Sequence, residues 1–354
     1  LDKKLEEFPD KEKYKKKVHD MKFLTLIEEK QKNNQQLSLY DLKFLYEVDS
    51  EIKGFGYEKD PRIEEIISKR DKRKDITRVY SVKEDEVALS HKEWKENKEK
   101  IKICCGNLYL NDLKSAKGLK LPNIVIGGVS LDNLTSSEGL VLPDIIKGNL
   151  YLENLTSAKG LKLPSTIIGY LNLEKLISAE GLKFPNTING RLYLDSLTSA
   201  EGLILPDTMN GYLCLKGLTS AKGLKLPSTI TGYLNLNGLK NAKDLELPDT
   251  INVDLDLSGL ISAKDLKLPN VINGDLYLHS LTSAKDLKLP KTITGDLYLK
   301  GLTSIEGLVL PISLFGRVYS KIDIPETCFI PDEEYYKYIN EDKNNENDEG
   351  IRKI

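Results

Sequence analysis

The sequence is poor in the residues from which metal and catalytic sites are most often built. Among 354 residues there are three histidines and four cysteines, and neither type recurs at the spacing of a zinc site. Cys104, Cys105, Cys214 and Cys328 are therefore expected to be unpaired structural thiols. The chain also lacks a Gly-rich phosphate loop and the GxSxG and HExxH motifs. We expect no catalytic residue, no metal site and no cofactor, and leave open whether residues 1–100 carry an activity.

Two further absences concern possible partners. The 52 Lys and Arg residues nearly balance the 54 Asp and Glu residues, so the basic excess typical of nucleic-acid binding is missing. No run approaches the ~18–20 apolar residues that a membrane-spanning helix needs. No export signal is visible, but the sequence starts at Leu1, and the compartment is left open. We expect a soluble monomer that neither binds nucleic acid nor spans a membrane.

A repeat of 21 residues dominates the chain from Gly106 onward. Glycine recurs at this interval from Gly106 to Gly316, with Val253 at the one exception, and proline recurs from Pro122 to Pro311. Written from its glycine, the unit is G-x-L-x-L-x-x-L-x-S-A-x-G-L-x-L-P-x-T-I-x. About ten units follow one another without an insertion.

Each unit alternates apolar and variable residues, as Leu150 and Leu152 illustrate, which predicts a strand with one buried face. A unit of this size cannot bury its own leucines, whereas stacked units bury them in one continuous core. We therefore predict a mainly β fold, a right-handed parallel β-solenoid of about ten coils, on the order of 48 Å long at ~4.8 Å per coil.

The small residues of the unit are expected at its corners. The opening glycines, and a second column occupied by Gly or Asp, suit turns with positive φ. A serine column is expected to hydrogen-bond the backbone at a corner of every coil; it comprises Ser115, Ser136, Ser157, Ser178, Ser199, Ser220, Asn241, Ser262, Ser283 and Ser304.

The unit Gly295–Leu308 resembles the strand-and-corner repeat of receptor L domains, which are short β-solenoids of the leucine-rich-repeat group. The resemblance covers roughly residues 100–320. The unit departs from the usual leucine-rich repeat because it has a serine ladder in place of an asparagine ladder and lacks a helix-length convex segment. The resemblance implies ligand binding through the surface of a sheet, but it identifies no ligand.

Three regions follow from these patterns: an α-rich region over 1–100, the solenoid over 101–320, and a C-terminal cap with a disordered tail over 321–354. The α-rich region is expected to cover the first coil. Its expected elements are helices over 11–32 and 37–46 and from Pro61, and a short strand over 76–82. A helical stretch over 333–339 is expected in the C-terminal cap.

The outward residues of the first strand are rich in tyrosine, a residue that interfaces favour. They are our candidate partner-binding residues: Tyr109, Tyr151, Asn172, Tyr193, Tyr212, Tyr233, Tyr277 and Tyr298. Strand propensity alone is an alternative reason for such a column. The variation between coils favours a function, because a purely structural column could repeat one residue. Replacing several of these tyrosines with alanine is expected to weaken partner capture and leave stability near wild type.

The same surface is expected to stack Asp254, Asp275 and Asp296, and like charges at ~4.8 Å repel. A cation or basic neighbours would relieve this repulsion, and a hydrated acidic patch is the simpler interpretation. The leading hypothesis is a non-enzymatic solenoid that recognises a protein or other macromolecule. The alternatives are a glycan-binding or glycan-processing solenoid that uses the aspartate stack, and a structural spacer. Two exposed lysine columns are expected to be mainly solubilising.

Overall fold

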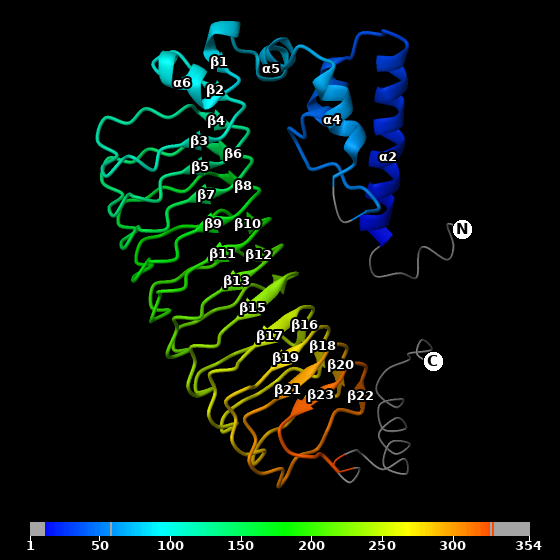
Figure 1. Cartoon of the computed structure of the whole chain (residues 1–354), viewed down its shortest axis with the longest axis vertical. Helices are drawn as coiled ribbons and strands as arrows, with labels where there is room; N and C mark the ends of the chain where they lie inside the picture. The colour runs from blue at the N-terminus through cyan, green and yellow to red at the C-terminus, as the bar shows by residue number, and fades with distance from the viewer. Residues whose placement is uncertain (1–10, 57–58, 326–327, 329–354) are drawn as a thin grey trace. The chain divides into compact units, whose positions relative to one another are not determined.

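The computed structural model describes residues 11–56, 59–325 and 328, and the chain divides between Cys105 and Gly106 into two compact units. The first unit is mainly helical, and the second is a parallel β-solenoid (Figure 1). Within the described ranges, none of the helices has the length and apolar character required to cross a bilayer.

The N-terminal unit contains five helices, one 3-10 turn and two short strands within its described residues. They are α2 (Lys11–Lys32), α3 (Leu39–Leu45), α4 (Pro61–Ser68), α5 (Lys72–Tyr80), η1 (Glu84–Glu86), β1 (Val87–Ala88), α6 (His91–Asn97) and β2 (Ile103–Cys104). The predicted helix over 11–32 is confirmed. Ser38 and Asp41 form a capping box at the start of α3, and Pro61 occupies the first turn of α4.

The predicted strand over 76–82 is wrong, because most of this segment belongs to helix α5. The side chain of Asp71 accepts a hydrogen bond from the Lys74 amide at the start of α5, and Ser81 ends the helix with a φ of 55°. Ile76 and Val79 are both buried, as expected for residues three apart on one helix face. A short apolar segment suits either structure, and the Asp71 cap favours the helix.

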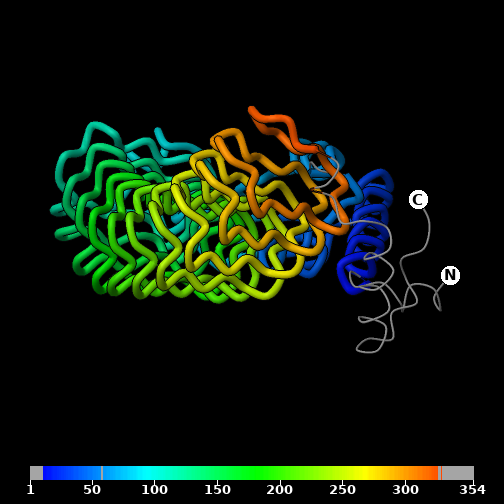
Figure 2. The backbone as a smooth tube through the Cα atoms, turned by 90° about the horizontal axis from the view of Figure 1, so that it is seen from below, coloured from blue at the N-terminus to red at the C-terminus, as the bar shows by residue number. Residues whose placement is uncertain are grey.

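The solenoid is built around one eleven-stranded parallel sheet, which begins at β3 and ends at β23. Its strands are β3 (Leu108–Tyr109), β5 (Val129–Ser130), β7 (Leu150–Tyr151), β9 (Leu171–Asn172), β11 (Leu192–Tyr193), β13 (Leu213–Cys214), β15 (Tyr233–Asn235), β17 (Asp254–Asp256), β19 (Leu276–Tyr277), β21 (Leu297–Leu299) and β23 (Val318–Ser320). Partners in neighbouring strands are 21 residues apart, as Leu192 and Leu213 show. The predicted parallel solenoid of about ten coils is confirmed, and Figure 2 shows its coils repeating along one axis.

Each coil contributes a second short strand to another surface of the solenoid (Figure 1). These strands are β4 (Ile124–Val125), β6 (Ile145–Ile146), β8 (Thr166–Ile167), β10 (Thr187–Ile188), β12 (Thr208–Met209), β14 (Thr229–Ile230), β16 (Thr250–Ile251), β18 (Val271–Ile272), β20 (Thr292–Ile293) and β22 (Ser313–Leu314). Pairing runs through β4–β6–β8, β10–β12–β14 and β16–β18–β20–β22.

The core of the solenoid is a stack of leucines. In one coil, Leu171, Leu173 and Leu176 are each 0% exposed, and the alanine Ala179 is 1% exposed. Burial of a leucine side chain contributes roughly 1.5–3 kcal/mol relative to its exposed state. Because the leucines fix which face of each strand points inward, they also fix which residues point to solvent.

The expected serine corners are present in every coil. In each of the ten coils, the serine-column side chain accepts a hydrogen bond from the backbone amide two residues later, as Ser157 does from Lys159 at 3.3 Å. The Gly/Asp column has positive φ throughout, for example 77° at Gly160 and 62° at Asp244. Each corner is therefore closed by contacts within its own coil.

Glycine is needed at the opening position of each coil for a different reason from the one predicted. They do not have positive φ in the described residues. A Cβ added to Gly148 would lie 2.6 Å from the backbone carbon of Gly127, one coil earlier. The close approach of successive coils, and not the conformation of the turn, therefore requires glycine at this position.

The expected C-terminal cap, its helical stretch over 333–339 and the tail lie almost entirely outside the described residues.

Candidate binding surface

The outward side chains of the eleven-stranded sheet form one continuous surface, which we call the tyrosine face. All eight candidate residues lie on it. Six occupy the second position of a strand, where register aligns Tyr277 with Tyr298 and Tyr193 with Cys214. Tyr212 and Tyr233 lie in the column two residues earlier. Most of the eight are half-buried, whereas Tyr109 in the first coil is 63% exposed.

A ladder of side-chain to backbone hydrogen bonds runs along the edge of the tyrosine face. The Oδ1 atom of Asp254 accepts a hydrogen bond from the Asp275 amide at 2.8 Å, and Oδ1 of Asp275 accepts one from the Asp296 amide at 2.7 Å. The Oδ1 of Asp296 accepts from the Arg317 amide at 2.7 Å. Asn149 makes the same contact with the Tyr170 amide at 2.8 Å. Side chains in the column of Asn149 and Asp254 therefore link successive coils, whether the residue is Asp or Asn.

The aspartate stack has more hydrogen-bond donors than the sequence suggested. Besides the backbone amides, the hydroxyl of Tyr277 donates to Asp275 Oδ2 at 2.9 Å, and the hydroxyl of Tyr298 donates to Asp296 Oδ2 at 3.3 Å. Burial and the Asp275 carboxylate raise the pKa of Tyr277. Across the described ranges, no group of three or more His, Cys, Asp or Glu side chains is placed to hold a metal ion. Hydrogen-bond donors of the protein itself therefore offset the repulsion between the stacked carboxylates.

The tyrosine rings of the last coils stack on one another. The centroids of Tyr298 and Tyr319 are 4.6 Å apart with ring planes 6° apart. The Nζ atom of Lys300 lies 5.5 Å from the Tyr298 centroid and 5.6 Å from the Tyr319 centroid. Nearby, burial and the Lys300 charge lower the pKa of His279. The ring faces are therefore largely occupied by each other and by a cation.

Tyr233 forms a buried polar cluster in the neighbouring coils. Its hydroxyl donates to Asp256 Oδ2 at 2.8 Å, and Asp256 is only 7% exposed. The Ser258 amide donates to the other oxygen of Asp256 at 2.8 Å. Burial and this carboxylate raise the pKa of Tyr233, so the phenol remains a hydrogen-bond donor at neutral pH. The contact between Tyr233 and Asp256, which are 23 residues apart, is not evident from the sequence.

The middle coils carry the one cysteine of the tyrosine face. The Cys214 thiol lies 3.2 Å from Asp195 Oδ1, and Lys216 Nζ lies 2.8 Å from the same oxygen. Burial, followed by the Asp195 carboxylate, raises the pKa of Cys214 to about 12. The thiol is therefore protonated at neutral pH and is a poor nucleophile. Asp195 Oδ2 is buried and has no hydrogen-bond partner among the residues that the structure describes.

Arg191 is a residue of this surface whose side-chain contacts are evident only from the structure. The guanidinium carbon of Arg191 lies 5.1 Å from the ring centroid of Tyr170 and 4.2 Å from that of Tyr212. Arg191 Nη1 also donates to the Tyr193 hydroxyl at 3.2 Å. The 21-residue spacing places these residues in adjacent coils, but only the side-chain rotamers show that the arginine lies between the rings.

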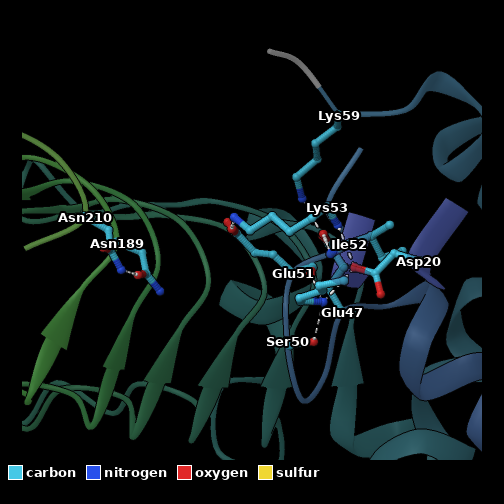
Figure 3. A network of polar contacts seen from close by, with 10 residues as sticks. Asp20, Glu47, Ser50, Glu51, Ile52, Lys53, Lys59, Asn189 and Asn210 are labelled. Carbon is cyan, nitrogen blue, oxygen red and sulfur yellow. Dashed lines mark hydrogen bonds and ion pairs between the residues drawn. The ribbon is translucent and has the colours of Figure 1, made fainter. Parts of the chain in front are cut away.

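The surface made by the second strands has a different character. From Thr187 to Thr294 its two outward columns carry threonine, asparagine and one valine, without a charged residue. The amide Nδ2 of Asn210 donates to Asn189 Oδ1 at 2.7 Å (Figure 3). This uncharged surface provides control positions for mutations on the tyrosine face.

The N-terminal unit contains buried carboxylates whose partners are structural. Lys16 Nζ lies 2.6 Å from Asp20 Oδ2, and the same oxygen accepts from the Lys53 amide at 2.9 Å, part of the network in Figure 3. Burial opposes ionisation of Asp20, but the hydrogen bonds from Lys16 and Lys53 prevail and lower its pKa. Asp75 is held similarly by Arg70 and by the Tyr46 hydroxyl at 3.1 Å. These contacts join helices and loops of one unit.

Comparisons of the chain with protein-family models, curated proteins and solved structures gave no match. The solenoid fold rests on the structure, and membership of the receptor L-domain group stays a hypothesis.

Proposed function

We propose that the solenoid is a non-enzymatic binding module that recognises a protein partner through the tyrosine face. The observation that carries the proposal is the order of this surface. Its tyrosines, acids and bases are held in place by rings and hydrogen bonds, both within a coil, as in the Tyr298–Asp296 pair, and between neighbouring coils, as in the Tyr298–Tyr319 stack. A surface fixed before binding loses little side-chain entropy when a partner docks, which favours affinity. Tyrosine and arginine are also the residue types most enriched at the energetic centres of interfaces.

The details of the surface favour a protein over a glycan. Both ring faces of Tyr298 are covered by stacking, and Tyr277 and Tyr319 each have one face covered by Tyr298, which leaves mainly ring edges for contact. The carboxylates of Asp275 and Asp296 already accept hydrogen bonds from amides and phenols, so they are poorly placed for acid–base chemistry on a sugar. Mixed polar and aromatic edges are typical of protein interfaces.

The proposal is tested by quantitative affinity capture with the full chain. The variant replaces Tyr151, Tyr193 and Tyr298 with alanine. The control replaces three exposed residues of the second-strand surface with alanine, namely Thr187, Thr229 and Thr250. We expect the tyrosine variant to recover at least about tenfold less of the partner than the control does, since hot-spot truncations commonly cost more than ~2 kcal/mol.

Equal recovery by both variants would contradict the proposal. Failure of the native chain to enrich any protein over the tyrosine variant would instead favour a spacer. Melting curves of both variants verify that each remains folded before capture is compared.

A further inference from the structure

Arg191 is held on the tyrosine face between two aromatic rings. Backbone hydrogen bonds place its neighbours in adjacent strands: the Leu171 amide donates to the Arg191 carbonyl at 2.8 Å, and the Leu192 amide donates to the Tyr212 carbonyl at 2.8 Å. The rings of Tyr170 and Tyr212 lie 5.1 and 4.2 Å from the guanidinium carbon. Ring contacts on both sides restrict the orientation of the guanidinium plane and leave its N–H edge for further hydrogen bonds.

Among the described residues, no carboxylate forms an ion pair with Arg191. Within the part of the chain that the structure describes, its polar contact is with the neutral Tyr193 hydroxyl. By contrast, Arg62, Arg70 and Arg73 in the N-terminal unit each form an ion pair with an acidic side chain. The nearby cation Lys216 is also paired, with Asp195. Arg191 therefore combines a restrained orientation, an unmatched charge and N–H donors that this single contact leaves unused.

The position of Arg191 suits the centre of an interface. It directly precedes β11, which has four strands of the sheet on one side and six on the other. Its neighbours in the adjacent coils are the rings of Tyr170 and Tyr212, and Asn172 and Cys214 flank the adjacent Tyr193. Energetic hot spots are commonly central arginines and tyrosines surrounded by contacts that contribute little energy themselves but exclude water.

We propose that the Tyr170–Arg191–Tyr212 clamp binds a side-chain carboxylate from an acidic segment of the protein partner. This inference rests on the proposed function of the tyrosine face. A planar guanidinium donates two parallel hydrogen bonds to a carboxylate, and the fixed plane of Arg191 favours this geometry. One cation matches one carboxylate, whereas phosphorylated motifs are usually read by clusters of arginines and nucleic acids by many cations.

The aspartate ladder limits which acidic segments fit. Asp254 belongs to the same column as Arg191, three coils further along. At ~4.8 Å per coil, the two residues are ~14 Å apart. A second carboxylate of the partner at that distance would meet Asp254, Asp275 and Asp296 and be repelled. The face thus favours a segment whose acidic residue is followed, ~14 Å away, by a neutral or basic residue.

The clamp can be tested without the native partner. The probe is a fluorescent, end-blocked hexapeptide that contains two adjacent glutamates, and its counterpart contains glutamines. Binding to the full chain is measured by anisotropy and by the Nε–Hε NMR signal of Arg191. We expect the glutamate peptide to saturate binding and shift this signal, and the glutamine peptide to do neither. Arg191→Met is expected to weaken binding at least about tenfold, since a charged hydrogen bond is lost.

Two further variants separate the clamp from general charge effects. Arg191→Lys keeps the charge but loses the planar fork, so its affinity should fall several-fold. Arg317 is an exposed arginine in the same column at the end of the sheet, and Arg317→Met should bind within about twofold of the native chain.

Unchanged affinity in Arg191→Met, equal binding of both peptides, or an unmoved Arg191 signal at millimolar peptide would overturn the inference. Tenfold tighter binding of a phosphoserine peptide would overturn the choice of carboxylate. These outcomes are distinct from failure of the proposed function. If the native chain does not bind the glutamate peptide but the triple tyrosine variant still captures less partner, the clamp is refuted and the tyrosine face is not.

Discussion

Tyr298 stacks on Tyr277 with ring centroids 4.5 Å apart and ring planes 9° apart. Tyr319 stacks on the opposite side of Tyr298, so one ring has aromatic neighbours on both faces. The expectation that alanine at such positions leaves stability unchanged therefore needs revision. The tyrosine face contributes to the fold as well as presenting a surface, and experiments on binding must separate the two roles.

Replacement of Tyr298 with alanine is expected to lower the free energy of unfolding by about 1–3 kcal/mol, because two aromatic pairs contribute about 0.5–1.5 kcal/mol each. Tyr298→Phe keeps both stacks and loses only a 3.3 Å hydrogen bond, so it should lie within about 1 kcal/mol of the native chain. Urea denaturation followed by circular dichroism measures both. Tyr109→Ala, at a 63% exposed position, is the control and should cost least.

Replacement of Asp275 distinguishes a hydrogen-bond ladder from a cation site. Asp275→Ala loses the contacts with the Asp296 amide and the Tyr277 hydroxyl, and should destabilise the chain by about 1–3 kcal/mol. Asp275→Asn keeps an acceptor oxygen for the amide and should lose less. Calcium should not raise the melting temperature of the native chain. A calcium-dependent rise that disappears in Asp275→Asn would show that the stack binds a cation.

The two glycine columns should respond differently to a side chain. Gly148→Ala places a Cβ 2.6 Å from the Gly127 backbone and should cost at least about 1–3 kcal/mol, as overpacked sites do. Gly160 has a φ of 77°, but nothing lies within 4 Å of an added Cβ. Because Asp244 adopts the same conformation naturally, Gly160→Asp should cost less than about 1 kcal/mol. Thermal melting of both variants provides the comparison, and a reversed order would refute this interpretation of the columns.

Cys214 should be alkylated slowly despite being only half-buried. Its pKa, raised to about 12, leaves almost no thiolate at pH 8. Asp195→Asn removes the neighbouring carboxylate, which should lower the thiol pKa and speed alkylation, whereas loss of the cation in Lys216→Met should not speed it. Mass spectrometry after timed treatment with iodoacetamide measures the rate. Fast labelling of the native chain at pH 8 would contradict the assigned environment.

The periodicity of the sequence predicted the fold because each repeated position has one local cause. The leucines had to face inward, and Ser157 and its equivalents had to close a corner, whatever the rest of the chain did. The strand predicted at 76–82 failed because one short segment has no such repetition, and the Asp71 cap favoured a helix. The role of the opening glycines was misjudged, since it depends on the distance between coils and not on the turn.

The contacts of the candidate surface were less accessible from the sequence. The eight tyrosine and asparagine positions could be placed on one face by counting residues. The position of Arg191 between two rings, and the Tyr233 hydroxyl on Asp256, depend on rotamers chosen among several neighbours. The aspartate stack suggested repulsion, because a sequence does not show that backbone amides 21 residues later point at the carboxylates.

The serine corners allow the number of coils in the solenoid to vary. Because the serine corner of every coil is stabilised by an amide only two residues away, this bend does not depend on which coil lies next to it. Duplication or loss of a 21-residue segment would then shift all later coils by one step and preserve their packing. Evolution could thereby lengthen, shorten or reorder the recognition surface in whole modules without a new fold.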